Sequence, residues 1–177
     1  MGEPINLTIE FLNAAQGDDA AQILKQAFHQ TDEEAHEIIG RMLERNKTRD
    51  CVAMLAASVD GKLAGVIACH KPVDNDPEDV YGVTNLAVNP ANRRYGIGHK
   101  LLAAAEAFIS GEWLKGQFGF ARLSDYTKRA KPDSHFYEDA GYVRDEETMG
   151  RPQDDPVLIK PLNEDAFPLA EPDKPAP

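Results

Sequence analysis

The sequence predicts an α+β domain in which helices flank a mostly antiparallel central sheet. Strand-like and helix-like segments alternate irregularly along the chain. An Asp60-Gly61 dipeptide, which favours a tight hairpin turn, joins strand-like segments at 51–59 and 62–69. A third strand-like segment follows with no helix between, and such a meander is typical of an α+β fold. The 177 residues, 42% of them hydrophobic, suffice for one domain with its own core.

The first part of the chain predicts one strand and two helices. Apolar residues alternate over residues 5–11, as expected for a half-buried strand. Over residues 18–29 they recur at helical spacing instead. Thr31 and Glu34 have the spacing of a capping box, so a second helix should begin there and end in the polar segment 46–49.

The predicted hairpin contains both cysteines of the chain, Cys51 and Cys69. A two-residue turn with regular pairing would place Cys51 opposite His70, so the two cysteines would point to opposite faces of the sheet. We therefore expect two reduced thiols. No Cys/His spacing resembles a zinc site, and no metal is expected.

The second half of the chain predicts a further helix and the remaining strands. An acidic loop with two prolines spans residues 71–79. The expected elements after it are strands at 81–88, 118–123, 142–147 and 157–162, a helix at 96–109, and a short helix between Pro132 and the Ala140-Gly141 stop. From residue 164 onward proline and acidic residues predominate, so we expect one domain at 1–163 and a mobile tail at 164–177.

Charge and hydropathy exclude several classes of protein. The net charge is −11, and no basic stripe is present that would neutralise nucleic-acid phosphates. No apolar segment approaches the roughly 18 residues of a membrane span, and the first residues lack the pattern of a secretory signal. We therefore expect a cytoplasmic protein that binds neither nucleic acid nor membrane.

A glycine-containing loop connects the strand at 81–88 to the helix at 96–109. It reads Asn89-Pro90-Ala91-Asn92-Arg93-Arg94-Tyr95-Gly96-Ile97-Gly98-His99. The first N–H groups of a helix have no intrahelical partner, and the helix dipole is positive there. Together with two arginines and two glycines, such a helix start predicts a cradle for a phosphate or pyrophosphate.

Two common phosphate-binding motifs do not fit this loop. A P-loop requires Gly-x-x-x-x-Gly-Lys-Ser/Thr, which the sequence lacks. A dinucleotide fingerprint requires a third glycine, where Leu101 stands, and glycines directly after the strand. About seven residues separate Val88 from Gly96 instead.

The loop resembles the central motif of the GCN5-related N-acetyltransferase (GNAT) superfamily, Arg/Gln-x-x-Gly-x-Gly/Ala at the start of a helix. Here it reads Arg93-Arg94-Tyr95-Gly96-Ile97-Gly98. A second segment, Phe136-Tyr137-Glu138 followed by Gly141-Tyr142, resembles the family's later helix. The resemblance covers about residues 5–162. It implies a single GNAT-type domain whose sheet is splayed at the cofactor strand.

The resemblance implies acetyl-CoA as cosubstrate and a set of residues that bind it. The backbone of the central strand would pair with the pantetheine arm, and the N–H groups of residues 94–99 would hold the pyrophosphate. An N–H of the same strand would stabilise the tetrahedral oxyanion. The implied cofactor-binding residues are Leu86, Ala87, Val88, Arg93, Arg94, Tyr95, Gly96, Ile97, Gly98 and His99.

The resemblance also implies one catalytic side chain. Tyr137 would protonate the departing thiolate. Many members place an asparagine where Ala130 stands, so that cofactor contact is missing here. The general base stays unassigned, because the strand at 81–85 contains no carboxylate. His70, Asp79, Asp125 and an ordered water chain are the candidates.

The implied activity is acetylation of a primary amine on a small molecule, and the acidic loop at 74–79 is expected to attract a cationic acceptor. A protein N-terminus or lysine is the alternative acceptor. A non-catalytic acyl-CoA sensor and an interaction module built on the tail are the other function classes considered. A homodimer is compatible with the family.

Overall fold

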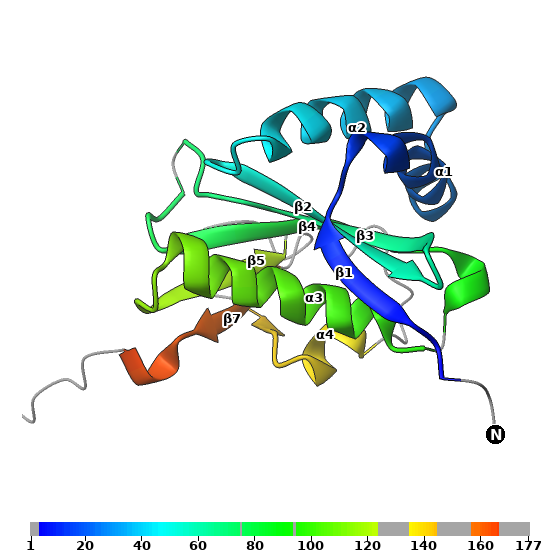
Figure 1. The fold of residues 1–177 in the computed structure, drawn as a ribbon. Helices are drawn as coiled ribbons and strands as arrows, with labels where there is room; N and C mark the ends of the chain where they lie inside the picture. Colours follow the sequence, from blue (N-terminus) through cyan, green and yellow to red (C-terminus); the bar gives the residue numbers. More distant parts are fainter. Residues whose placement is uncertain (1–3, 75, 94, 124–134, 145–156, 167–177) are drawn as a thin grey trace, which may run out of the picture.

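The computed structural model describes residues 4–74, 76–93, 95–123, 135–144 and 157–166 (Figure 1). Its strands are β1 (Leu7–Phe11), β2 (Val52–Val59), β3 (Lys62–His70), β4 (Val80–Val88), β5 (Gly119–Leu123), β6 (Val143–Arg144) and β7 (Leu158–Leu162). Its helices are α1 (Gly17–Phe28), α2 (Asp32–Asn46), α3 (Ile97–Phe108) and α4 (Phe136–Asp139). Short turns of 3-10 or π helix are η1 (Ala14–Gln16), η2 (Pro90–Asn92), η3 (Ile109–Trp113) and η4 (Glu164–Ala166). Strands and α-helices follow one another in the predicted order.

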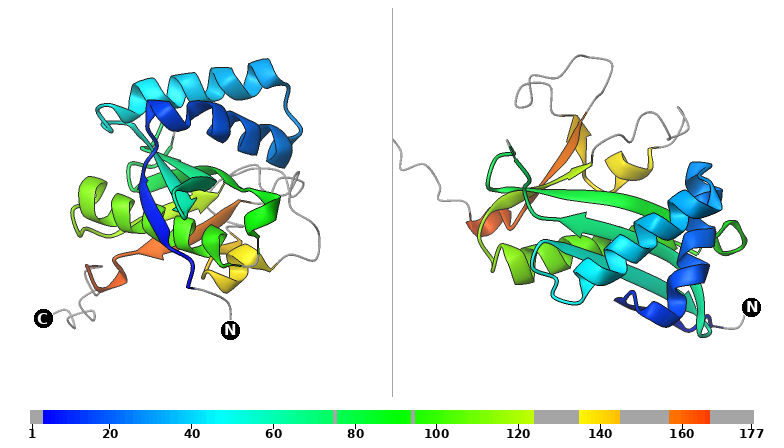
Figure 2. Two further views of the ribbon diagram at one scale, coloured as in Figure 1. Left: turned by 45° about the vertical axis from the view of Figure 1, so that its right-hand side comes forward. Right: turned by 90° about the horizontal axis from the view of Figure 1, so that it is seen from above.

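The seven strands form one sheet in the order β1-β2-β3-β4-β5-β7-β6. Only β4 and β5 are parallel, and every other pair of neighbours is antiparallel. Helices α1 and α2 cover one face of the sheet and α3 covers the other (Figures 1 and 2). The predicted α+β fold with a mostly antiparallel, helix-flanked sheet is confirmed.

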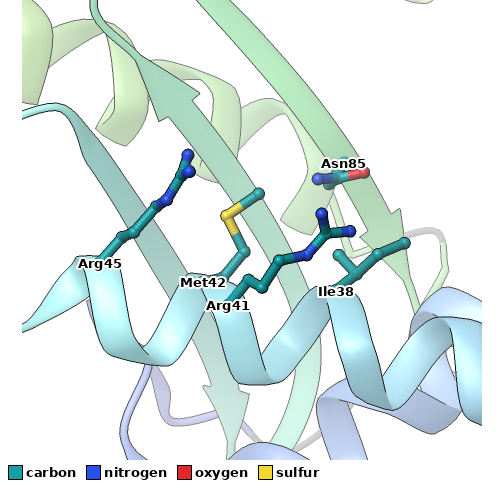
Figure 3. Close-up of a pocket in the computed structure, with 5 residues that line it drawn as sticks. All are labelled: Ile38, Arg41, Met42, Arg45 and Asn85. Atoms are coloured by element: carbon teal, nitrogen blue, oxygen red, sulfur yellow. The ribbon is translucent and has the colours of Figure 1, made fainter.

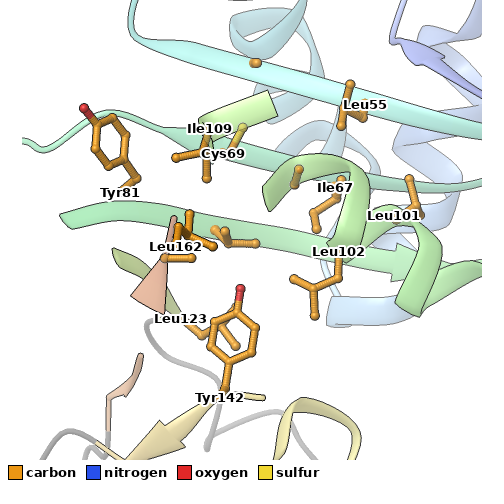
Figure 4. Packing of buried hydrophobic residues seen from close by; sticks show 14 of the residues in the cluster. Leu55, Ile67, Cys69, Tyr81, Leu101, Leu102, Ile109, Leu123, Tyr142 and Leu162 are labelled. Atoms are coloured by element: carbon orange, nitrogen blue, oxygen red, sulfur yellow. The ribbon is translucent and has the colours of Figure 1, made fainter. Parts of the chain in front are cut away.

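Each face of the sheet carries its own apolar core. Leu101 and Leu102 of α3 pack with Ile67, Leu123 and Tyr142 on one side (Figure 4). On the other side α1 and α2 bury their alanine, leucine and isoleucine residues against alternate positions of β2 and β3. Side chains alternate between the faces of a strand, so β2 and β3 are buried on both sides.

Helix α2 is fixed at both ends. At its start Oγ1 of Thr31 accepts from the backbone N–H of Glu34 at 3.2 Å, and the Glu34 carboxylate accepts from Thr31 N–H at 2.8 Å. This is the capping box that the sequence predicted. At its end the buried Asn46 amide donates to the carbonyls of Leu12 and Met54 and accepts from Met54 N–H. These bonds hold α2 against the sheet.

The hairpin between β2 and β3 has the predicted turn but not the predicted register. Asp60 and Gly61 both have positive φ, as a type I′ turn requires. A β-bulge follows, because Ser58 pairs with Leu63 but Ala57 pairs with Gly65. The extra residue places Val52 opposite His70, so the register expected for Cys51 is wrong by one residue. Both cysteines are free, and Cys51 is exposed whereas Cys69 is buried.

The end of the chain is described only in part. Residues 164–166 of the expected tail form η4, and residues 167–177 lie outside the described residues. The expected boundary at residue 163 therefore stays a prediction. The short helix expected from Pro132 begins later, at Phe136, because His135 is its non-helical N-cap. No helix in the described segments is long and apolar enough to cross a bilayer.

Candidate functional site

The central feature of the site is that β4 pairs with β5 over only part of its length. The parallel pairing covers Val80–Val83 of β4 and ends opposite Leu123. The rest of β4, residues 84–88, has no β5 partner among the described residues. On that side its backbone groups have no strand partner in the described part of the chain, and a ligand lying along the strand could pair with them. Leu86, Ala87 and Val88 all belong to this unpaired segment.

A bulge interrupts β4 inside the same segment. Ala68 of β3 pairs with Thr84 and Val66 pairs with Ala87, so two residues of β4 lie opposite one residue of β3. Asn85 adopts a left-handed conformation with φ of 53°. Asparagine tolerates this region better than most residues. The bulge resets the alternation of side chains and bends the strand.

The predicted cradle is the amino-terminal end of α3. Gly96 is the N-cap and has φ of 69°, which a residue with a side chain rarely adopts. No described side chain caps this helix end, and the first helical bond is from Lys100 N–H to the Gly96 carbonyl. The N–H groups of Ile97, Gly98 and His99 are therefore oriented outward for an anion.

Gly98 is the point at which the three predicted segments meet. A Cβ at this position would lie 3.1 Å from the Phe136 ring of α4 and 3.8 Å from Val88 of β4. The His99 ring also contacts Phe136, with a centroid distance of 4.1 Å. The sequence predicted a glycine here for close approach of a ligand. The structure shows a second reason, which is the close packing of α4 against α3.

Tyr137 is held beside this junction by aromatic neighbours. It contacts Phe136 edge-to-face at 5.0 Å between ring centroids and Tyr142 at 6.2 Å. Tyr142 is buried under α3, and burial together with the Glu106 carboxylate raises the pKa of its phenol above the usual range. Glu106 is also ion-paired to Lys160 at 2.8 Å. Tyr142 is thus a neutral structural residue, and Tyr137 is the half-buried one.

His70 is a candidate base beside β4, opposite the residue two positions before the segment that lacks a described β5 partner. It pairs with Gly82 across the β3–β4 ladder, and its ring lies so close to Gly82 that any Cβ there would overlap it. Nδ1 of the ring is 2.8 Å from the carbonyl of Lys71. In the neutral ring Nδ1 is therefore the donor, which leaves Nε2 as the atom with the free lone pair.

Of the other two candidate bases, the structure describes only Asp79. Asp79 is exposed and precedes β4, at the end of the strand away from the unpaired segment. Asp125 lies outside the described residues, as do Arg94 and Ala130.

One acidic residue of the loop before β4 has an internal partner. Asp76 accepts two hydrogen bonds from the guanidinium of Arg122 on β5, at 2.8 and 3.0 Å. This partner holds the pKa of the Asp76 carboxyl below its usual range. Arg122 pairs with Gly82 in the sheet, so the ion pair holds the loop to β5 close to the point where the described pairing of β4 with β5 ends. The charge of the Asp76 carboxylate is therefore not available to an acceptor.

A pocket of about 210 Å³ lies between α2 and β4 (Figure 3). Its lining residues are Ile38, Arg41, Met42, Arg45 and Asn85. None of these residues was predicted from the sequence to belong to a site. The arginines are four residues apart on α2, so they lie on one face of the helix. The strand that this face lies against can be identified only once the order of the strands in the sheet is known.

Comparison with known proteins places the chain among acetyltransferases. Residues 18–142, more than half of the chain, match the model of a family described as the acetyltransferase (GNAT) family. No curated protein matches the chain.

Several solved structures share the fold. A PaiA N-acetyltransferase from Thermoplasma acidophilum in complex with coenzyme A is 18% identical, with a TM-score of 0.64 over 88% of this chain and 98% of that one. An aminoglycoside 6′-acetyltransferase type Ii is 18% identical, with a TM-score of 0.66 over 86% and 96%. A GNAT family acetyltransferase from Brucella melitensis in complex with acetyl-CoA is 19% identical, with a TM-score of 0.56 over 78% and 83%.

Proposed function

Because this chain belongs to the acetyltransferase (GNAT) family, we propose that it transfers the acetyl group of acetyl-CoA directly to a primary amine of a small molecule. The observation that carries the proposal is the junction at Gly98. There the unpaired strand, the uncapped helix start and the helix of Tyr137 come together. Two of the similar structures are aminoglycoside 6′-acetyltransferases, which supports a small-molecule acceptor.

The cosubstrate would lie along β4. Backbone groups of Leu86, Ala87 and Val88 would bond the pantetheine arm in place of the missing β5 partner. The outward N–H groups at the start of α3 would bind the pyrophosphate, and the exposed Arg93 would add positive charge there. The donors are backbone groups, so their positions depend on the conformation of Gly96 rather than on side chains.

The chemistry needs one proton removed and one supplied. The amine nitrogen attacks the thioester carbonyl, an N–C bond forms, and the C–S bond breaks with the thiolate leaving. We assign the amine proton to Nε2 of His70, whose tautomer is set by the Lys71 carbonyl. The Tyr137 hydroxyl then protonates the thiolate.

Calorimetric titration with acetyl-CoA tests the cofactor site. The matched variants are Gly98→Ala and Gly98→Glu, since both place the same Cβ against Phe136 but only glutamate adds a carboxylate beside the pyrophosphate. We expect micromolar binding by the wild type, weaker binding by the alanine variant and none by the glutamate variant. A wild type that does not bind acetyl-CoA would refute the proposed function.

Turnover with a panel of amines tests the catalytic assignments. Tyr137→Phe and His70→Gln should each lower kcat by roughly 10²- to 10⁴-fold, while acetyl-CoA affinity is retained. Unchanged kcat in the phenylalanine variant would exclude Tyr137 as the acid. Binding of acetyl-CoA with no turnover of any amine would instead indicate an acyl-CoA sensor.

A further inference from the structure

We propose that the acceptor amine carries an anionic group, a carboxylate or a phosphate, which Arg41 and Arg45 bind in the pocket between α2 and β4 (Figure 3). This inference rests on the proposed function and names the class of acceptor. It differs from the cationic acceptor that the acidic loop suggested.

The pocket lies where an acceptor must approach. Asn85, which forms part of its lining, belongs to the segment of β4 that has no β5 partner among the described residues. The cosubstrate thioester is expected along this segment. Asn85 also lies in the bulge, where it forms part of the pocket wall on the β4 side. A molecule in the pocket therefore reaches from α2 to the cofactor strand.

The two arginines give this pocket a charge opposite to that of the chain. The protein has 30 acidic and 19 basic residues and a net charge of −11. Arg45 has no carboxylate partner among the described residues, and the neighbouring Glu44 is ion-paired with Lys47 at 2.6 Å. In the same part of the chain the one carboxylate paired with Arg41 is that of Glu37, at the long distance of 3.9 Å.

The geometry suits a planar or tetrahedral anion. Residues four apart on a helix project from the same face, and in Figure 3 both side chains extend from α2 towards the sheet. Guanidinium groups bind carboxylate and phosphate oxygens through paired hydrogen bonds. Ile38 and Met42 supply apolar walls beside them. The anion would lie at α2, and the amine would point to β4.

The volume indicates a small acceptor. About 210 Å³ is below the range of roughly 300–1,000 Å³ that is typical for drug-sized ligands. An amino acid or an amino phosphate has the required combination of size, amine and anion.

The experiment compares matched acceptors at saturating acetyl-CoA. The first arm pairs L-amino acids with their amides, and the second pairs O-phosphoethanolamine with ethanolamine. The variants are Arg45→Gln, Arg41→Gln and Lys47→Gln, the last of which removes the same charge at the C-cap of α2, outside the pocket. We expect one anionic series to be acetylated with a lower KM than its neutral partners. In Arg45→Gln that KM should rise roughly 10- to 100-fold, while Lys47→Gln behaves as wild type and the neutral amines are unaffected.

Three results would overturn the proposal. These are a KM that is equal for anionic and neutral acceptors, an Arg45→Gln effect no larger than that of Lys47→Gln, and turnover of peptides or polyamines only. Calorimetry with acetyl-CoA on the same preparations distinguishes a failure of the proposed function from a failure of the anionic acceptor alone. If acetyl-CoA does not bind, the proposed function itself has failed. If it binds and any of the three results is obtained, only the anionic acceptor is refuted.

Discussion

The ion pair between Asp76 and Arg122 gives the sharpest prediction for stability. Both side chains are almost fully buried, with 10% and 6% of their surface exposed. Asp76→Ala would leave the guanidinium of Arg122 buried without its two charged hydrogen bonds. Loss of one partner of a buried ion pair costs about 3–5 kcal/mol.

The expected change is large enough for routine assays. For a chain of this size about 1 kcal/mol corresponds to roughly 2–4 °C in Tm, so Asp76→Ala should lower Tm by roughly 6–20 °C. Circular dichroism during heating and urea titration would measure it. The control is the double variant Asp76→Ala/Arg122→Met, which removes both charges and should recover much of the loss. A loss under about 1 kcal/mol, or a double variant no more stable than the single one, would show that the buried Arg122 does not depend on Asp76.

The same pair predicts a dependence on pH. The pKa of Asp76 is lowered in the folded protein from its ordinary value of 3.8, mainly by its hydrogen bonds to Arg122. The stabilisation that the Asp76 carboxylate contributes is therefore complete above the pKa that Asp76 has in the unfolded chain. It is lost as the pH falls through the pKa that Asp76 has in the folded protein. The stability difference between wild type and Asp76→Ala should be constant near neutrality and shrink below about pH 4. A difference that stays constant down to pH 2 would contradict this assignment.

Three further predictions concern single sites. Burial raises the pKa of the Cys69 thiol to about 12 while Cys51 is exposed, so titration with a thiol reagent at about pH 8 should find one reactive cysteine in the native protein and two in guanidinium. Asn46→Ala should cost on the order of 3 kcal/mol in urea unfolding, because it leaves buried backbone groups unpaired; a loss under about 1 kcal/mol would show that water replaces the amide. Gly82→Ala should displace the His70 ring and reduce kcat as His70→Gln does, with acetyl-CoA affinity retained; wild-type kcat in this variant would exclude His70 as the base.

Local signals in the sequence predicted the elements well. The Thr31–Glu34 capping box, the Asp60-Gly61 turn and the Gly96 helix start each depend on a few neighbouring residues, and all three are present in the structure. Their order along the chain was enough to predict the fold class. The resemblance in the loop before α3 and around Tyr137 then predicted segments that do meet in space.

Features that depend on pairing between distant residues could not be predicted. The bulges at Ala64, between the partners of Ala57 and Ser58, and at Asn85 have no local signature, and each changes which residues face one another. The position of the His70 ring over Gly82 follows from that register. Asp76 and Arg122 are 46 positions apart in the sequence, so their ion pair could be predicted only if the order of the strands were known. The pocket was missed for the same reason.

The bulge at Asn85 constrains how this protein could change its acceptor during evolution. A left-handed backbone conformation admits glycine, asparagine and aspartate far more readily than branched or bulky residues. The β4 side of the pocket therefore has a short list of permitted replacements. Positions 41 and 45 are exposed and helical, and they accept almost any side chain without strain. Divergence among relatives with new acceptors should therefore accumulate on α2, and directed evolution of acceptor preference has its widest choice there.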